Sequence, residues 1–137
     1  MATAQKPAAL ELVWSEELRF AGKAGANAIV VDGNGAAGPS PTQLLTLGLT
    51  GCMAADVVAI LQKGRHPLTA VRVSVTGERA AEIPRRFLSF SLHFHVHGSV
   101  PAEAVERAIA LSREKYCSVW HSLRQDIELT TTFDILP

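Results

Sequence analysis

The stretch GPSPTQLLTLGLTGCM, residues 38–53, decides how this chain is interpreted, because it changes abruptly from turn-forming residues to an apolar run ending near Cys52. The apolar residues that follow Thr42 cover nearly every face of a helix: Leu44, Leu45, Leu47, Leu49, Met53, Val57, Val58, Ile60 and Leu61. A helix that is apolar all round belongs in the centre of a fold or at a subunit interface. We expect Ser40 or Thr42 to cap this helix and residues 63–65 to end it.

Segments with strand-like patterns lie on both sides of this helix. The predicted strands are residues 10–20, 28–32 (joined to the first by a turn at 22–25), 71–75, 90–96 and 127–135. An amphipathic helix is predicted over residues 102–115, capped by Ser99, and a short helical piece begins near Cys117. This order predicts an α+β fold with antiparallel sheets wrapped around a central buried helix, in one domain over residues 1–137.

Composition limits the classes of partner. Mean hydropathy is +0.17, which is high for a small soluble monomer and indicates a large apolar interface, hence a homo-oligomer. Lys and Arg together number 13, as do Asp and Glu, and no basic face stands out. We therefore expect neither nucleic acid nor an anionic membrane as a partner.

The expected location is the cytoplasm. The first 14 residues lack a long apolar core and include Lys6 and Pro7, so they do not resemble a secretory signal. Polar residues interrupt the apolar run over residues 44–61, which argues against a transmembrane span. Disulfides in the cytoplasm are mostly transient and catalytic rather than structural.

The two cysteines, Cys52 and Cys117, have several interpretations. They could be inert or structural, they could form a redox pair, or Cys117 could bind a metal with His121, four residues later on one helical face. A reactive Cys52 needs a positive charge or hydrogen-bond donors from elsewhere, because Asp56, one turn later, would raise its pKa. From the residues alone these interpretations remain open.

Other polar residues suggest sites less strongly. His93, His95 and His97 share one strand face, a spacing that can hold a metal, but the serines that continue this face favour a solvent-facing polar surface. By itself, Arg19 predicts a solvated strand edge or a surface ion pair. Asp56, in an apolar helix, must find a backbone amide, hydroxyl or arginine as a partner.

Three segments together resemble the OsmC/Ohr family of osmotically inducible and organic-hydroperoxide-resistance proteins, and the OsmC-like branch most. They are GPSPTQLLTLGLTGCMAADVVAILQKGR, GERAAEIPRRF and AIALSREKYCSVW. The likeness runs from Trp14 to the last strand, and a helix-borne cysteine paired with a YCSV segment at this separation is specific. The resemblance implies the OsmC-like fold, an intertwined homodimer with its sites at the subunit interface, and a thiol peroxidase that reduces organic hydroperoxides or hydrogen peroxide.

The resemblance also implies residue roles. Cys52 would be the peroxidatic cysteine, Cys117 the resolving cysteine, and Arg19 the cation that holds the Cys52 thiolate. No metal or organic cofactor is implied, and a dithiol reductant (a lipoyl protein, thioredoxin or a small thiol) would restore both cysteines. Family members commonly carry a glutamate early in the cysteine-bearing helix, where this chain has Thr42 and Gln43. That departure favours an alternative, a non-catalytic module that holds a small apolar or thiol ligand at the dimer interface.

Overall fold

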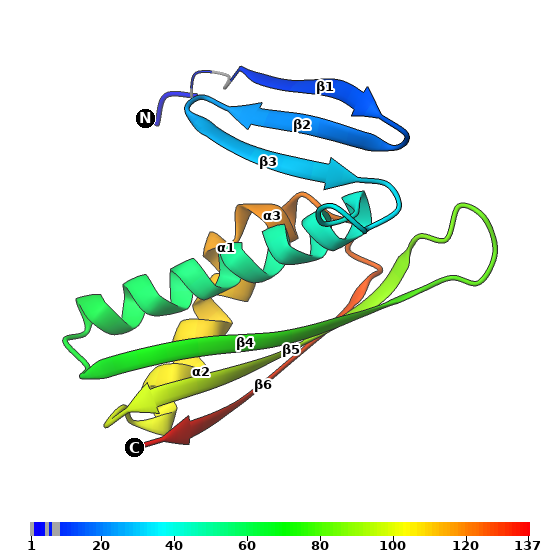
Figure 1. Cartoon of the computed structure of the whole chain (residues 1–137). Helices are drawn as coiled ribbons and strands as arrows, with labels where there is room; N and C mark the ends of the chain where they lie inside the picture. The colour runs from blue at the N-terminus through cyan, green and yellow to red at the C-terminus, as the bar shows by residue number, and fades with distance from the viewer. Residues whose placement is uncertain (1, 5, 7–8) are drawn as a thin grey trace. The chain divides into compact units, whose positions relative to one another are not determined.

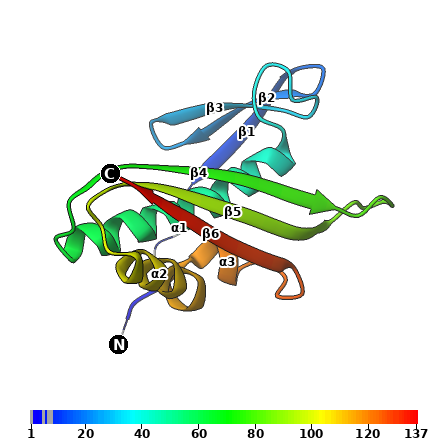
Figure 2. The same ribbon diagram turned by 90° about the horizontal axis from the view of Figure 1, so that it is seen from below.

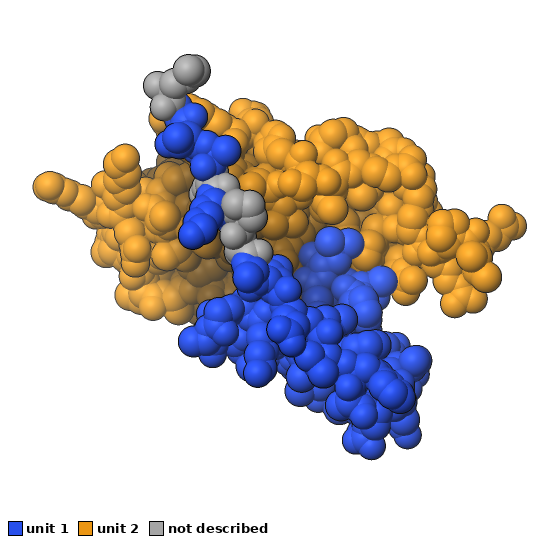
Figure 3. Space-filling view, turned by 90° about the horizontal axis from the view of Figure 1, so that it is seen from above, with its two compact units in different colours: residues 1–45 blue, residues 46–137 orange. Residues whose placement is uncertain are grey.

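The computed structural model describes residues 2–4, 6 and 9–137, which fall into two compact units, residues 1–45 and 46–137 (Figure 3). The expectation for the N-terminal segment, with Pro7, therefore lies partly outside the described residues. The first unit holds an antiparallel sheet of β1 (Leu10–Glu16), β2 (Arg19–Ala24) and β3 (Asn27–Asp32). The prediction of one domain over residues 1–137 stays a prediction.

The first strand pair differs from the sequence prediction. Residues 10–20 are not one strand, because the chain reverses at Glu17 and pairs Trp14 with Phe20. Glu17 has a φ of 48°, and the Trp14 indole N–H donates to its carbonyl oxygen at 2.8 Å. The next turn follows Ala24 instead of occupying residues 22–25. The first turn contains no Gly, Pro or Asn, so the usual turn signal is missing from the sequence.

Helix α1 (Pro41–Lys63) begins and ends as the sequence predicts. The Gln43 backbone N–H donates to Ser40 Oγ at 3.3 Å, and the Ser40 N–H donates to Gln43 Oε1 at 2.9 Å. This reciprocal pair is a capping box. One face of α1 is buried, through Leu49, Thr50, Met53, Val57 and Leu61, whereas Leu45 and Leu47 are exposed in the single chain.

By length and composition alone, α1 is the one helix among the described residues that could cross a membrane, with a mean hydropathy of 2.0 in its most apolar window. Core helices of soluble proteins pass the same test. Here Met53, Val57 and Leu61 lie in the hydrophobic core of the second unit, which explains the apolar composition of this face.

The second unit contains the sheet β4 (Leu68–Arg79), β5 (Phe87–Gly98) and β6 (Glu128–Leu136), in the spatial order β4-β5-β6 (Figure 1). Strand β5 buries alternate residues against the core: Phe90, Leu92, Phe94 and Val96. Strands β4 and β5 are antiparallel, but β6 runs parallel to β5, so this sheet is mixed instead of purely antiparallel. The chain crosses over through helices between β5 and β6, which is what a parallel pair requires.

The crossover contains α2 (Ala102–Leu111), the π-helical segment η1 (Ser112–Tyr116) and the short helix α3 (Ser118–His121). The predicted helix over residues 102–115 is therefore α2 followed by a π-helical turn. The prediction that Ser99 caps it is wrong, because Pro101 precedes the first turn and no side chain caps it. The predicted junction at Cys117 is confirmed, since its ψ of 97° separates η1 from α3.

Candidate active site

The fold brings the two cysteines together, although 65 positions separate them in the sequence. Cys52 lies in the middle of α1 and is half-buried, whereas Cys117 is fully buried at the start of α3, and both are free thiols. The two Sγ atoms and a carboxylate oxygen of Asp56 all lie within 4.8 Å of one another. The packing of the crossover against α1 therefore creates a compact cluster of two thiols and one carboxylate.

Hydrogen-bond donors surround the Cys52 sulfur. Burial raises the pKa of Cys52, but hydrogen bonds from the Val119 backbone N–H, the Cys117 thiol and the Ser118 hydroxyl lower it, and Asp56 raises it again. The net pKa is below the ordinary value of 9.0. Ser118 Oγ lies 3.8 Å from Cys52 Sγ. Donors from the start of α3 thus supply part of the thiolate stabilisation that the local sequence around Cys52 lacks.

Cys117 has the opposite electrostatic environment. Its pKa is raised to about 11, and burial is the largest cause. The hydrogen bond that its sulfur accepts from the Trp120 N–H at 3.4 Å opposes this rise, whereas the hydrogen bond and negative charge of Cys52 and the charge of Asp56 contribute to it. At neutral pH, Cys117 is therefore a neutral thiol that donates a hydrogen bond toward Cys52. The pair combines one sulfur with a lowered pKa and one with a raised pKa.

Asp56 has the hydroxyl partner that the sequence analysis expected. Ser112 Oγ donates to Asp56 Oδ2 at 2.8 Å, and Ser112 itself is fully buried in η1.

The proposed pairing of Cys117 with His121 as metal ligands is not supported, because His121 is exposed and does not belong to the ligand cluster around Cys117. Among the described residues, Cys52 and Asp56 are the potential ligands near Cys117.

Arg19 belongs to the first unit, at the start of β2, where carboxylates surround it. Its guanidinium nitrogens lie 3.3 Å from Glu16, 3.8 Å from Glu17 and 3.5 Å from Asp32. Its Nε is buried and has no hydrogen-bond partner among the described residues. The surface ion pair that the residue alone predicts is thus confirmed, with the buried Asp32 as a further carboxylate partner.

Asp32 is the functional candidate that sequence reasoning missed. It is almost completely buried, and its carboxylate accepts hydrogen bonds from three backbone N–H groups of the following loop, those of Asn34, Ala36 and Ala37. The hydrogen bond from Ala37 contributes most to lowering the pKa of Asp32, and Arg19 lowers it further. Asp32 therefore supplies a carboxylate to Arg19, although the start of α1 has none. Its position as the last residue of β3, before a glycine-rich loop, is the one available sequence signal.

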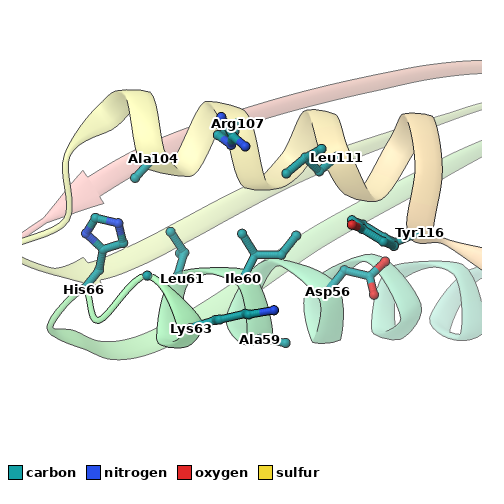
Figure 4. Close-up of a pocket in the computed structure, with 11 residues that line it drawn as sticks. Asp56, Ala59, Ile60, Leu61, Lys63, His66, Ala104, Arg107, Leu111 and Tyr116 are labelled. Atoms are coloured by element: carbon teal, nitrogen blue, oxygen red, sulfur yellow. The ribbon is translucent and has the colours of Figure 1, made fainter.

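A cavity of about 620 Å³ lies between α1 and α2, with Asp56 and Tyr116 at one end and His66 at the other (Figure 4). Its apolar lining includes Ile60, Leu61, Ala104 and Leu111, and its cationic lining includes Lys63 and Arg107. Asp56 belongs both to this wall and to the thiol cluster. The cavity depends on how two helices pack, so no sequence motif predicts it.

Comparison with known proteins identifies the family. A family model described as OsmC-like protein matches residues 33–132. The chain belongs to the OsmC-like family. Protein YhfA of Escherichia coli (strain K12) is 42% identical over 126 residues, which cover 90% of this chain and 94% of that protein. This relationship confirms the family resemblance drawn from the cysteine-bearing segments.

Solved structures confirm the OsmC-like fold, since an OsmC like protein from Mycoplasma pneumoniae has a TM-score of 0.85 and 16% identity, covering 98% of this chain and 100% of that one. A hypothetical protein from Aquifex aeolicus VF5 has a TM-score of 0.88 and 27% identity, covering 96% of this chain and 97% of that one. An organic hydroperoxide resistance protein from Elizabethkingia anophelis has a TM-score of 0.71 and 17% identity, covering 98% of this chain and 99% of that one. At 16% and 17% identity the first and third likenesses concern the fold alone.

Proposed function

We propose that this OsmC-like protein is a cysteine-based peroxidase that reduces organic hydroperoxides through a Cys52–Cys117 disulfide cycle. The observation that carries the proposal is the asymmetric thiol pair, with both sulfurs in one cluster, a lowered pKa at Cys52 and a raised pKa at Cys117. A peroxidase of this kind needs a thiolate that attacks and a second thiol that waits in its protonated form. The hydroperoxide-resistance names of structural neighbours are consistent with this chemistry.

The reaction balances in three steps. The Cys52 thiolate attacks one oxygen of the O–O bond, the bond breaks, and a proton completes the departing alcohol, leaving Cys52 as a sulfenic acid. The Cys117 thiol then displaces water from that sulfenic acid and forms a disulfide. An external dithiol reduces the disulfide and is itself oxidised, which restores both cysteines. No metal or organic cofactor takes part in these steps.

We assign to Arg19 the role of a cation for the thiolate and the peroxide oxygens. Its fully charged guanidinium stabilises negative charge and forms directed hydrogen bonds. In this chain, Glu16, Glu17 and Asp32 provide the carboxylates that orient it. Arg19→Ala is expected to slow peroxide consumption, whereas Lys23→Ala, an exposed control on the same strand, leaves the rate unchanged. An unchanged rate in Arg19→Ala contradicts this role.

The α1–α2 cavity supports an organic substrate over hydrogen peroxide. Its lining is largely apolar near Ile60, Leu61 and Leu111, and it reaches Asp56 beside the thiols. An apolar organic group gains free energy by leaving water for such a lining, whereas hydrogen peroxide gains nothing from it. Cumene hydroperoxide is therefore expected to react faster than hydrogen peroxide with the reduced protein.

We also propose that the protein is a homodimer located in the cytoplasm. In the described chain, large apolar side chains of the first unit are exposed: Leu10, Leu12, Val13, Trp14, Leu18, Ile29 and Val30. Such an amount of exposed apolar surface is typical of a subunit interface. Trp14→Glu is expected to shift the mass measured by light scattering toward the monomer, and Glu11→Gln on the same strand serves as the control. A monomeric wild-type protein contradicts the proposal.

Mass spectrometry after one equivalent of cumene hydroperoxide tests the enzyme directly. The wild-type chain is expected to lose two hydrogens as the intramolecular disulfide forms. Cys52→Ser is expected to abolish peroxide consumption, whereas Cys117→Ser allows one turnover and then gains oxygen atoms at Cys52. If Cys52→Ser consumes peroxide as fast as the wild type, with the same dithiol, the peroxidase proposal is wrong.

A binding module is the second candidate, and the cavity is the observation that favours it. Its volume of about 620 Å³ falls in the range of small-molecule sites, and its lining combines apolar and cationic groups. In this case both thiols remain unchanged after exposure to cumene hydroperoxide, and the module holds a small apolar or thiol ligand without transforming it.

A further inference from the structure

The face of the second sheet that points away from the core carries a compact polar cluster. Strand β5 buries its even-numbered residues from Phe90 to Val96, so His93 and His95 lie on the opposite face. Asp134 on β6 pairs with His95 in the parallel register. Figure 2 shows the three strands in front of α1, and none of the helices in the described part of the chain crosses them on this side. These side chains therefore lie on the sheet face opposite the core.

Three potential metal ligands converge there. Asp134 Oδ1 lies 2.8 Å from His93 Nε2 and 3.0 Å from His95 Nδ1. The three ligand atoms all lie within 4.8 Å of one another. Zinc ligands lie about 2.1 Å from the ion in tetrahedral geometry and therefore stand ~3.4 Å apart, slightly farther than the two distances to Asp134. The observed spacing thus already approximates one facet of a coordination shell.

The remaining ring nitrogens have hydroxyl partners that orient the rings. His93 Nδ1 lies 2.6 Å from Thr132 Oγ1, and His95 Nε2 lies 3.2 Å from Ser74 Oγ. When these two nitrogens carry the ring protons, the lone pairs of His93 Nε2 and His95 Nδ1 both face the Asp134 carboxylate. A cation between the three atoms relieves that repulsion. Metal-binding histidines commonly donate their other N–H to an outer partner in this way.

We propose that His93, His95 and Asp134 bind a divalent transition-metal ion, with Zn²⁺ as the reference ion. Two imidazoles and one carboxylate suit zinc, iron, nickel or copper better than magnesium or calcium. The side chains are 36%, 20% and 42% exposed, which leaves space for water to complete the coordination. The inference uses a different part of the fold from the thiol cluster and does not rest on the peroxidase proposal.

The test must separate this site from the thiols, because Cys52, Cys117 and Asp56 also form a potential ligand cluster. Zinc sulfate is therefore titrated calorimetrically into the full chain carrying Cys52→Ser and Cys117→Ser. One zinc ion per chain is expected to bind. The site is refuted if this protein shows no saturable binding.

Single substitutions in that background locate the ion. His93→Ala or His95→Ala is expected to weaken zinc binding at least about tenfold, since even outer-shell changes cost that much. His97→Ala is the matched control, on the same face of β5 but outside the cluster, and is expected to bind zinc like the parent. An equal loss in His97→Ala, or no loss in His93→Ala, overturns the proposal.

A second measurement leaves β5 and β6 unsubstituted, so it remains valid if a histidine variant fails to fold. Nitrogen-15 spectra of the histidine rings are recorded in the cysteine-free background before and after addition of zinc. The structure predicts which nitrogens shift, Nε2 of His93 and Nδ1 of His95. The proposal is contradicted if zinc shifts only the ring nitrogens of His66, His97 or His121. It is also contradicted if the rings of His93 and His95 both remain N–H donors to Asp134 in the presence of zinc.

Discussion

The opposite pKa shifts of the two thiols predict a large difference in their alkylation by iodoacetamide. At pH ~8, a pKa of about 11 leaves ~0.1% of Cys117 as thiolate, whereas a pKa below 9.0 leaves at least ~10% of Cys52 in that form. The more acidic thiolate is intrinsically less nucleophilic, which reduces this hundredfold ratio to about tenfold. The complete burial of Cys117 widens the ratio again, because the reagent cannot reach its sulfur.

The assay is peptide mapping by mass spectrometry after short alkylation pulses across a range of pH. Cys52 is expected to be alkylated more than about ten times faster than Cys117. The same pulses in concentrated urea serve as the control, because unfolding gives both thiols ordinary pKa values and equal access. Comparable rates in the folded protein, or a preference that persists in urea, refute the electrostatic reasoning.

Three further predictions follow from individual contacts. Ser118→Ala removes a donor to Cys52 worth about 0.5–1.5 kcal/mol, which lowers its thiolate fraction at neutral pH about two- to twelvefold. Because the less acidic thiolate is more nucleophilic, Cys52 alkylation is expected to slow about 1.5- to fourfold. Ser112→Ala leaves Asp56 without its hydroxyl partner and is expected to lower the free energy of unfolding, measured in urea, by about 1–3 kcal/mol. The lowered pKa of Asp32 stabilises the folded state above the unfolded value near 3.8, and this stabilisation is lost as pH falls through the lower folded value. Thermal melts of Asp32→Asn are therefore expected to depend less on pH below about 5 than those of the wild type, and identical slopes contradict this.

The sequence correctly predicted those helices and strands whose backbone conformation depends on residues close together in the chain. The capping box of α1 and the alternation of β5 are readable because they depend on neighbours within a few residues. The reversal at Glu17 was missed because its turn carries no glycine or proline. The parallel pairing of β6 was missed because strand direction depends on how the crossover packs, which no local pattern encodes.

For the candidate site, the sequence by itself determined which chemically capable groups are present, two thiols and a strand with alternating histidines, and the family resemblance added Arg19 as an expectation. Only the tertiary structure decided that Cys52 and Cys117 share one cluster and that His93 and His95 meet Asp134. It also decided which thiol is acidic, because a pKa depends on burial and on hydrogen-bond donors from a distant segment. Such donors are close in space and distant in the chain, so their effect on Cys52 exists only after the crossover has packed against α1.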